Sequence, residues 1–448
     1  MRIIIIGNGI AGTNAARYIR KYGNHEITMI SDESEYPFSR TALMYVYMGH
    51  LRTKDIKLYE DDFWDKNKIS RIKAWVKDIN PSVHSITLDD NRILEYDRLI
   101  IATGSKSNKF NWPGQELTGV QGLYHMQDLE RMEALSPKVK HAVIVGGGLI
   151  GIEMAEMFHS RHIAVTFLVR ESNFWNHVLP IQESLMIDQE ILDHGIDLRL
   201  EDGLNEIIND GRGHVAAVIT SKGEKIETQF VGLTVGVSPN IDFLKGISIE
   251  TNRGILVDDY LQTSQEDIYA IGDCVELRSP SAGRKAVEAI WYAGRIMGQT
   301  VAHTICKSPI PYNPGTWFNS AKFFNIEYQV YGDVPPRMTD EINSVFWQHP
   351  NGKKSIRINF RESDLSVTGF NLLGIRYRHE VCEKWIQSKT NIEEVLQHLS
   401  IANFDPEFFI QYEKNLLDQY YHYSGKKLTL KSSRKLNLVT RFLRQAIK

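Results

Sequence analysis

Residues 2–12 read RIIIIGNGIAG, an apolar stretch that runs directly into the pattern G-x-G-x-x-G. The four consecutive isoleucines predict a strand buried on both faces, and helical sequence follows the last glycine. Between a strand and a helix, such glycines let the backbone turn tightly, approach a pyrophosphate and pack the helix closely. We therefore predict a dinucleotide site whose binding residues are Gly7, Gly9, Ile10, Ala11 and Gly12.

An acidic residue that binds the ribose of the dinucleotide is expected about 20 residues beyond the glycine pattern. A second strand is predicted at residues 26–30, and Asp32 and Glu33 stand just beyond it. Both acids are therefore candidate cofactor-binding residues.

Residues 141–151 read HAVIVGGGLIG and repeat the strand and the glycine turn. We interpret the repeat as an internal duplication of a nucleotide-binding unit. Two such sites need two dinucleotides, and the simplest pair is FAD with NADH or NADPH, because a flavin accepts hydride from a nicotinamide. The second set of predicted binding residues is Gly146, Gly147, Gly148, Leu149, Ile150 and Gly151.

The strand after the second glycine turn ends at Val169, Arg170 and Glu171. An acid at this point favours the free 2′-hydroxyl of NADH, whereas an arginine suits the 2′-phosphate of NADPH. Arg170 is a candidate binding residue, but no second basic residue supports it. The sequence therefore leaves the choice open, with a slight preference for NADH.

Composition and charge narrow the remaining possibilities. The chain has 448 residues, enough for two to four domains at roughly 100–200 residues each. With a formal net charge of -3, the molecule as a whole lacks the positive electrostatic potential that attracts nucleic acid. The three cysteines form no Cys-x-x-Cys pair and the histidines show no ligand spacing, so we predict no metal site and a reducing compartment. No apolar run of about 18 residues is present, and the expected location is the cytoplasm.

Three further motifs accompany the glycine turns: YDRLIIATGS at 96–105, VGVSPN at 235–240 and TSQEDIYAIGDC at 263–274. In this order and spacing, the set resembles the FAD-dependent pyridine nucleotide-disulphide oxidoreductase superfamily. The resemblance implies an α/β fold with two Rossmann-like three-layer domains and a smaller α+β C-terminal interface domain.

The resemblance also implies a domain division. An FAD-binding domain would be formed by residues 1–110 and 246–325, and an NAD(P)-binding domain by residues 111–245. Residues 326–424 would form the interface domain, and residues 425–448 a basic tail.

Cofactor contacts are carried over from the family onto matching positions. Asp273 would accept a hydrogen bond from the ribityl chain of FAD, Gly236 would lie near the nicotinamide nucleotide, and Val76 near the adenine. The implied contacts are Val76, Ala102, Thr103, Gly104, Gly236, Gly272 and Asp273.

Residues 36–45, where the disulfide reductases of the superfamily carry reactive cysteines, contain none. Without a thiolate at the flavin, thiol–disulfide exchange is not expected. The chain is instead similar to the branch of ferredoxin, rubredoxin and putidaredoxin reductases.

Several positions carry this similarity to the branch. Arg40 matches the arginine of its R-P-P-L-S-K stretch, Trp291 fits a helix of the branch near the flavin, and Trp317 matches an aromatic segment close to the isoalloxazine. Glu153 matches a catalytic-site glutamate, but Tyr45 replaces the lysine that pairs with it. Glu153 and Glu156 could equally be a solvated pair on a helix.

The function implied is an FAD-dependent NAD(P)H oxidoreductase that passes electrons to a small redox protein resembling ferredoxin or rubredoxin. Two alternatives remain open at this point: a peripheral membrane NADH:quinone reductase, and a nucleotide-binding interaction protein similar to apoptosis-inducing factor. A homodimer is also left open.

The tail from residue 425 carries eight basic residues and no acid, with apolar residues at helical spacing near its end. We expect a basic amphipathic helix that docks on an acidic surface of the same chain. An anionic membrane surface or an acidic electron carrier are the other partners considered.

Overall fold

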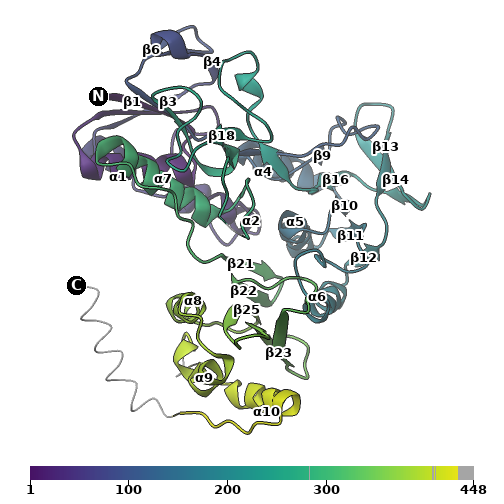
Figure 1. Ribbon diagram of the computed structural model, residues 1–448. Helices are drawn as coiled ribbons and strands as arrows, with labels where there is room; N and C mark the ends of the chain where they lie inside the picture. The colour runs from purple at the N-terminus through teal and green to yellow at the C-terminus, as the bar shows by residue number, and fades with distance from the viewer. Residues whose placement is uncertain (282, 406–407, 409, 432–448) are drawn as a thin grey trace. The chain divides into compact units, whose positions relative to one another are not determined.

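The computed structural model describes residues 1–448 except 282, 406, 407, 409 and 432–448. The chain divides into two units, each drawn from separate segments (Figure 1). Unit 1 comprises Met1–Gly146, Met157–Val165 and Leu204–Pro314, and unit 2 comprises Gly147–Glu156, Thr166–Gly203 and Gly315–Lys448. The domain boundaries expected from the sequence stay a prediction, and the helix expected near the end of the tail lies outside the described residues.

Unit 1 is built on a five-stranded parallel sheet with the order β19-β7-β1-β2-β3. The first strand along the chain lies in the middle, and its isoleucines are buried because both faces of the sheet are covered. The chain adds strands first on one side of β1 and then on the other, and in open α/β sheets such a reversal marks the ligand-binding end at the carboxyl ends of the strands. The strands are β1 (Arg2–Ile6), β2 (Glu26–Ser31), β3 (Ile69–Lys73), β7 (Arg98–Ile101) and β19 (Ile268–Ala270).

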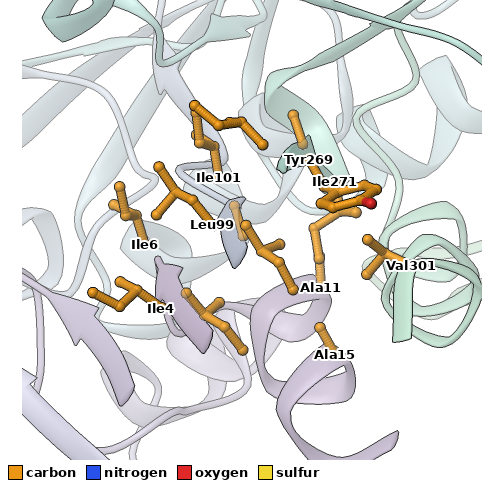
Figure 2. Close-up of a cluster of buried hydrophobic side chains, with 14 of the residues drawn as sticks. Ile4, Ile6, Ala11, Ala15, Leu99, Ile101, Tyr269, Ile271 and Val301 are labelled. Carbon is orange, nitrogen blue, oxygen red and sulfur yellow. The ribbon is translucent and has the colours of Figure 1, made fainter. Parts of the chain in front are cut away.

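Helices α1 (Ile10–Tyr22) and α7 (Trp291–Cys306) lie side by side although nearly the whole of unit 1 separates them in sequence (Figure 1). Figure 2 shows how Ala11 and Ala15 of α1 and Val301 of α7 join the isoleucine and leucine side chains of β1 and β7 in one buried cluster. Gly298 permits the close approach, because a Cβ at this position would lie 2.5 Å from the Ala11 carbonyl oxygen. The sequence pattern predicts a helix over about 284–303, whereas α7 begins at Trp291.

Smaller elements complete unit 1. Three sets are antiparallel: β4 (Val76–Asn80), β5 (Ser85–Leu88) and β6 (Ile93–Glu95); β13 (Leu204–Asn209), β14 (Val215–Thr220) and β15 (Lys225–Glu227); and the pair β8 (Ser105–Ser107) and β17 (Val237–Pro239). Two sets are parallel: the pair β18 (Ile255–Val257) and β20 (Val275–Leu277), and the set β9 (Val120–Gln121), β16 (Phe230–Leu233) and β10 (His141–Val145). The helices are α2 (Leu43–Tyr47), α3 (Phe63–Lys66) and α4 (Met126–Leu135).

Unit 2 contains a five-stranded antiparallel sheet with the order β21-β22-β25-β24-β23. Alternate residues of β24 (Ile356, Ile358, Phe360) join the core formed with the C-terminal helices. On the other face, Arg357 donates to Glu183 of α6 at 2.7 and 2.9 Å. The sheet consists of β21 (Phe318–Phe323), β22 (Ile326–Gly332), β23 (Ile342–Gln348), β24 (Ser355–Arg361) and β25 (Val367–Leu373), and the helices are α8 (His379–Gln387), α9 (Ile392–Gln397) and α10 (Glu413–Ser424).

The remaining elements of unit 2 follow the second glycine turn. From Thr166 onward β11 (Ala164–Val169) runs parallel to β12 (Asp197–Leu200). Helices α5 (Leu149–Ser160) and α6 (Ile181–Asp193) belong to the same stretch, although the last residues of α5 fall in unit 1. The predicted α/β class with parallel Rossmann-like sheets is confirmed. Within the described part of the chain, no helix is both long and apolar enough to cross a bilayer.

Candidate functional site

The first glycine turn has two glycines that the fold needs and one that it does not. Gly7 has φ +106°, and a Cβ there would overlap the Ala102 carbonyl oxygen, while a Cβ at Gly12 would overlap the carbonyl oxygen of Gly7. A Cβ at Gly9 would meet no atom within 4 Å. Glycine at position 9 therefore leaves open the space that the close approach of a pyrophosphate would require.

The second glycine turn repeats this geometry. Gly146 has φ +113°, and a Cβ there would lie 2.7 Å from the Thr234 carbonyl oxygen. A Cβ at Gly147 would lie 2.8 Å from Cγ1 of Val169, whereas one at Gly148 would meet nothing within 4 Å. Gly9 and Gly148 thus share the same open surroundings, and both turns fit a dinucleotide phosphate.

The N-terminus of α1 adds an electrostatic contribution at the first turn. Gly9 is its N-cap residue, no side chain caps the helix, and no acidic residue occupies its first turn. The uncapped backbone amides and the helix dipole therefore favour an anion at this end.

Asp273 comes to this end of α1 from a distant part of the chain. Gly272, with φ +79°, lies against Ala11, since a Cβ there would be 3.0 Å from the Ala11 Cβ. The Asp273 Oδ2 atom accepts hydrogen bonds from Tyr124 Oη at 3.2 Å and Ser105 Oγ at 3.4 Å. Burial raises the pKa of Asp273, while the two hydrogen bonds and the charge of Arg40 oppose the rise.

Glu33 and Arg40 form a partly buried ion pair. The guanidinium donates to both carboxylate oxygens at 2.9 and 2.7 Å, and Glu33 also accepts from the Met126 backbone amide at 2.8 Å. Burial alone would raise the pKa of Glu33, but hydrogen bonds from His125 and Arg40 lower it to about 2. The Glu33 carboxylate is thus occupied by protein donors, whereas Asp32 is exposed.

The ATG segment and the VGVSPN segment lie next to each other. Strands β8 and β17 pair, and Thr103 Oγ1 donates to the Asn240 carbonyl at 2.8 Å. The Gly236 carbonyl accepts from the Asn108 amide at 3.1 Å, and Gly236 has φ +89°. Gly104 and Gly236 therefore flank the same two-stranded ribbon, at its opposite ends.

Glu153 lies on α5 in unit 2, and no lysine in the described part of the chain pairs with it. Burial raises the pKa of Glu153, and the negative charge of Glu156 raises it further, to about 7. Lys322 of β21 pairs with Oε1 of Glu156 at 2.5 Å, while Glu156 Oε2 is buried without a hydrogen-bond partner. A lysine from another segment thus meets the acids of α5, but it binds Glu156 rather than Glu153.

The other predicted residues have simpler surroundings. Arg170 is largely exposed and pairs with Oε1 of Glu171 at 3.1 Å, and the Glu171 side chain is the more buried of the two. Val76 is buried in the core of unit 1, where it pairs with Leu88. Trp291 begins α7 in unit 1, and Trp317 precedes β21 in unit 2.

Two residues that sequence reasoning missed join these clusters. Tyr124 contacts Asp273 and Arg40, and Lys322 contacts Glu156. Neither belongs to a motif, because each acquires its role from segments that only the fold brings together.

Comparison with known proteins agrees with this geometry. A family model for the pyridine nucleotide-disulphide oxidoreductases matches residues 1–302. The chain belongs to this family. FAD and NAD(H) are the cofactors of the family, and its members are oxidoreductases, so the predicted superfamily and enzyme class are confirmed.

Individual relatives of the pyridine nucleotide-disulphide oxidoreductase family point to one branch. Rhodocoxin reductase from Rhodococcus erythropolis is 30% identical over 328 residues, which cover 72% of this chain and 76% of the relative. Rubredoxin-NAD(+) reductase from Pseudomonas putida is 29% identical over 323 residues, which cover 71% and 83%. The solved water-forming NADH oxidase from Lactobacillus brevis has a TM-score of 0.79 at 18% identity and covers 94% of this chain and 98% of that chain, a likeness of fold alone.

Proposed function

We propose that this protein takes hydride from NADH into FAD and passes the electrons to a small redox protein. The observation that carries the proposal is the pair of glycine turns, each with one glycine that no contact within the chain requires. Bound FAD would supply the chemistry, because a flavin accepts two electrons from a nicotinamide and releases them singly or together.

In this proposal, the residues of unit 1 hold FAD. The backbone amides at the N-terminus of α1 would bind the pyrophosphate, and Asp273 would accept from the ribityl chain. Arg40 contributes positive charge, although Glu33 offsets much of it. Val76, Ala102, Thr103 and Gly104 stay predicted contacts.

The nicotinamide nucleotide would bind at the turn formed by residues 146–151. Glu171 is more buried than Arg170 and pairs with it, which supports NADH over NADPH. When it is protonated, the Glu153 side chain is neutral and would place no negative charge in the site. Gly236, Trp291 and Trp317 stay predicted neighbours of the reacting rings.

The proposed acceptor is a carrier protein such as a rubredoxin or ferredoxin, by analogy with rhodocoxin reductase and rubredoxin-NAD(+) reductase. Residues 36–45 contain no cysteine, so an internal disulfide is not available to receive the electrons. The three cysteines are all unpaired, which agrees with the reducing cytoplasm that we propose as the location.

The decisive experiment is an anaerobic titration of the purified chain. We expect a yellow protein whose flavin absorbance is bleached rapidly by NADH and more slowly by NADPH. A protein that neither contains FAD nor takes it up, or that ignores both nucleotides, would refute the proposal.

Separate acceptor assays then distinguish the alternatives. Rubredoxin, a [2Fe–2S] ferredoxin and a short-chain quinone are each added to the NADH-reduced protein. Fast turnover with a carrier protein supports the proposal, and fast turnover with the quinone alone favours the quinone reductase. Slow bleaching with no fast acceptor favours the interaction protein.

The tail and the oligomeric state have their own tests. Flotation with anionic vesicles, with and without residues 425–448, measures membrane attachment, which we do not expect. Sedimentation equilibrium distinguishes a monomer from a homodimer.

A further inference from the structure

Tyr124 lies between β9 and α4, outside every motif, yet its hydroxyl joins two segments of the candidate FAD site. The hydroxyl donates to Oδ2 of Asp273 at 3.2 Å and accepts from the Ser105 backbone amide at 2.9 Å. The residues it connects are distant in sequence, so the contact exists only because unit 1 folds around β7 and β19.

The tyrosine is held firmly in this position. Its backbone amide donates to Asp128 at 2.8 Å, and its carbonyl oxygen accepts from Arg40. The Arg40 guanidinium carbon also lies 4.4 Å from the centre of the Tyr124 ring. Since Glu33 fixes Arg40 through two hydrogen bonds, the phenol has little freedom to turn away from Asp273.

The backbone of the ATG segment leaves room for this phenol. Gly104 has φ +69°, and a Cβ at this position would approach the Tyr124 hydroxyl to 2.9 Å. A larger residue at position 104 would therefore push the hydroxyl away from Asp273 and from the Ser105 amide.

Both protein donors to Asp273 act on the same oxygen, Oδ2. Among the described residues, no donor hydrogen bonds to Oδ1, which leaves this oxygen available to a ligand. Tyr124 and Ser105 are neutral, so the carboxylate is oriented without direct ion pairing.

We propose that Tyr124 is a positioning residue of the flavin site, holding Asp273 by Oδ2 so that Oδ1 accepts a hydrogen bond from a hydroxyl of the FAD ribityl chain. This inference rests on the proposed binding of FAD in unit 1. It adds a residue that lies outside the glycine turns and the GDC segment.

The test compares Tyr124→Phe with Tyr47→Phe in the full chain. Tyr47 is a buried tyrosine of unit 1 whose hydroxyl forms a hydrogen bond of 2.5 Å with Ser136 Oγ and, among the described residues, with no predicted site residue. We expect Tyr124→Phe to weaken FAD rebinding to the apoprotein about tenfold, as loss of a hydrogen bond to a charged group would. The Tyr47→Phe control should bind FAD like the parent chain.

Two further readouts separate positioning from a structural role. The midpoint potential of bound flavin should become more positive in Tyr124→Phe. Without the phenol donor, the Asp273 carboxylate more readily takes up a proton, and loss of its negative charge near the flavin favours the reduced form. In a double-mutant cycle with Asp273→Asn, the two effects on FAD affinity should not add, since both act through one hydrogen bond.

The outcomes are distinguishable from those of the proposed function. A parent chain that binds FAD, with Tyr124→Phe binding equally well at an unchanged potential, would overturn the inference alone. Additive effects in the cycle would also overturn it. A parent chain that cannot bind FAD would refute the proposed function itself. If Tyr124→Phe folds poorly, Ser105→Ala removes the other side-chain donor to Oδ2 and is measured in its place; unchanged FAD rebinding in this variant would contradict the inference.

Discussion

Gly9 and Gly148 are glycines whose identity the packing of the chain does not explain. Gly9 has φ -65°, a conformation that any residue can adopt, and a Cβ at either position would meet no atom within 4 Å among the described residues beyond its immediate neighbours. Such a methyl group would instead intrude on a phosphate lying against the backbone.

We predict that Gly9→Ala and Gly148→Ala act on different ligands. Gly9→Ala should lower FAD affinity by about tenfold or more and leave the melting temperature of the apoprotein nearly unchanged. Gly148→Ala should keep its FAD but raise the dissociation constant for NADH. Flavin fluorescence and stopped-flow bleaching measure the two effects. Gly12→Ala is the contrasting control, because its clash with Gly7 should destabilise the fold whether or not FAD is bound.

Glu33 is predicted to stabilise unit 1 in a pH-dependent way. Its pKa is about 2 in the folded chain and about 4.5 when unperturbed, so its favourable contribution is complete above pH 4.5 and is lost as the pH falls toward 2. Glu33→Gln should therefore lower stability by at most about 3 kcal/mol at pH 7 and by much less near pH 3. Thermal melts across this range measure the difference. The exposed neighbour Glu35, changed to Gln, should have little effect, and equal losses at both pH values would contradict the prediction.

Site residues that belong to a sequence motif could be found from the sequence, but the side chains that contact them in the fold could not. The glycines are visible because their spacing is local and only glycine allows the turn. Tyr124 and Lys322 were not visible, because each meets its partner through contacts spanning more than 140 residues. The roles of Asp32, Glu33 and Arg170 stay predictions, because the sequence does not tell which of two neighbouring charged residues faces the ligand.

At the scale of elements, α1 and α7 depend on small residues for their close contact. We predict that Gly298→Val destabilises unit 1 by about 1–3 kcal/mol, because the added carbon atoms enter space occupied by the Ala11 carbonyl. FAD affinity should fall with it, since α1 carries the first glycine turn. Chemical denaturation measures the loss. Gln299→Val, at the exposed neighbouring position, is the matched control, and equal effects of the two variants would show that helix propensity rather than packing is responsible.

Helix α5 carries two neighbouring acids, Glu153 and Glu156, and Lys322 of β21 pairs with Glu156. The pKa of Glu153 is about 7, above the ordinary value of 4.5, so folding disfavours its charged form and stability is lost as the pH rises from 4.5 through 7. We predict that Glu153→Gln matches the parent chain at pH 5 and exceeds its stability at pH 8, by at most about 3 kcal/mol. Melting temperatures at the two pH values test this, with the exposed Glu130→Gln as control. Parallel pH profiles for parent and variant would show that Glu153 does not titrate in this range.

Strands and helices were predictable where their periodicity is strong. The buried strands β1 and β10 and the helices after them follow the sequence pattern, because both faces of a parallel strand are apolar. Helix α7 begins at Trp291 rather than near residue 284, and the stretch ahead of it includes the charged residues Arg284, Lys285 and Glu288. The predicted helix in the tail stays untested.

At the scale of the molecule, the C-terminal sheet is joined to α6 by a buried ion pair within unit 2. The Glu183 side chain is fully buried and that of Arg357 is 4% exposed. Removing one partner leaves a buried charge without compensation, so Arg357→Leu should destabilise unit 2 by about 3–5 kcal/mol. Denaturation followed by tryptophan fluorescence measures this loss.

Two variants keep this last prediction specific. The double change Glu183→Leu with Arg357→Leu should recover most of the stability, because no charge is then left buried. Arg361→Leu, at an exposed position of the same strand, should have little effect. A double variant as unstable as the single one would indicate that packing rather than charge is responsible.

The order of strands in unit 1 has a consequence for protein synthesis. Strand β19 and helix α7 close the edge of the sheet and cover α1, yet they lie hundreds of residues after the turn at Gly7. A nascent chain that has exposed only its first glycine turn lacks both Asp273 and the helix that packs on Ala11. We therefore expect the flavin to be captured only after the segment through Cys306 has left the ribosome.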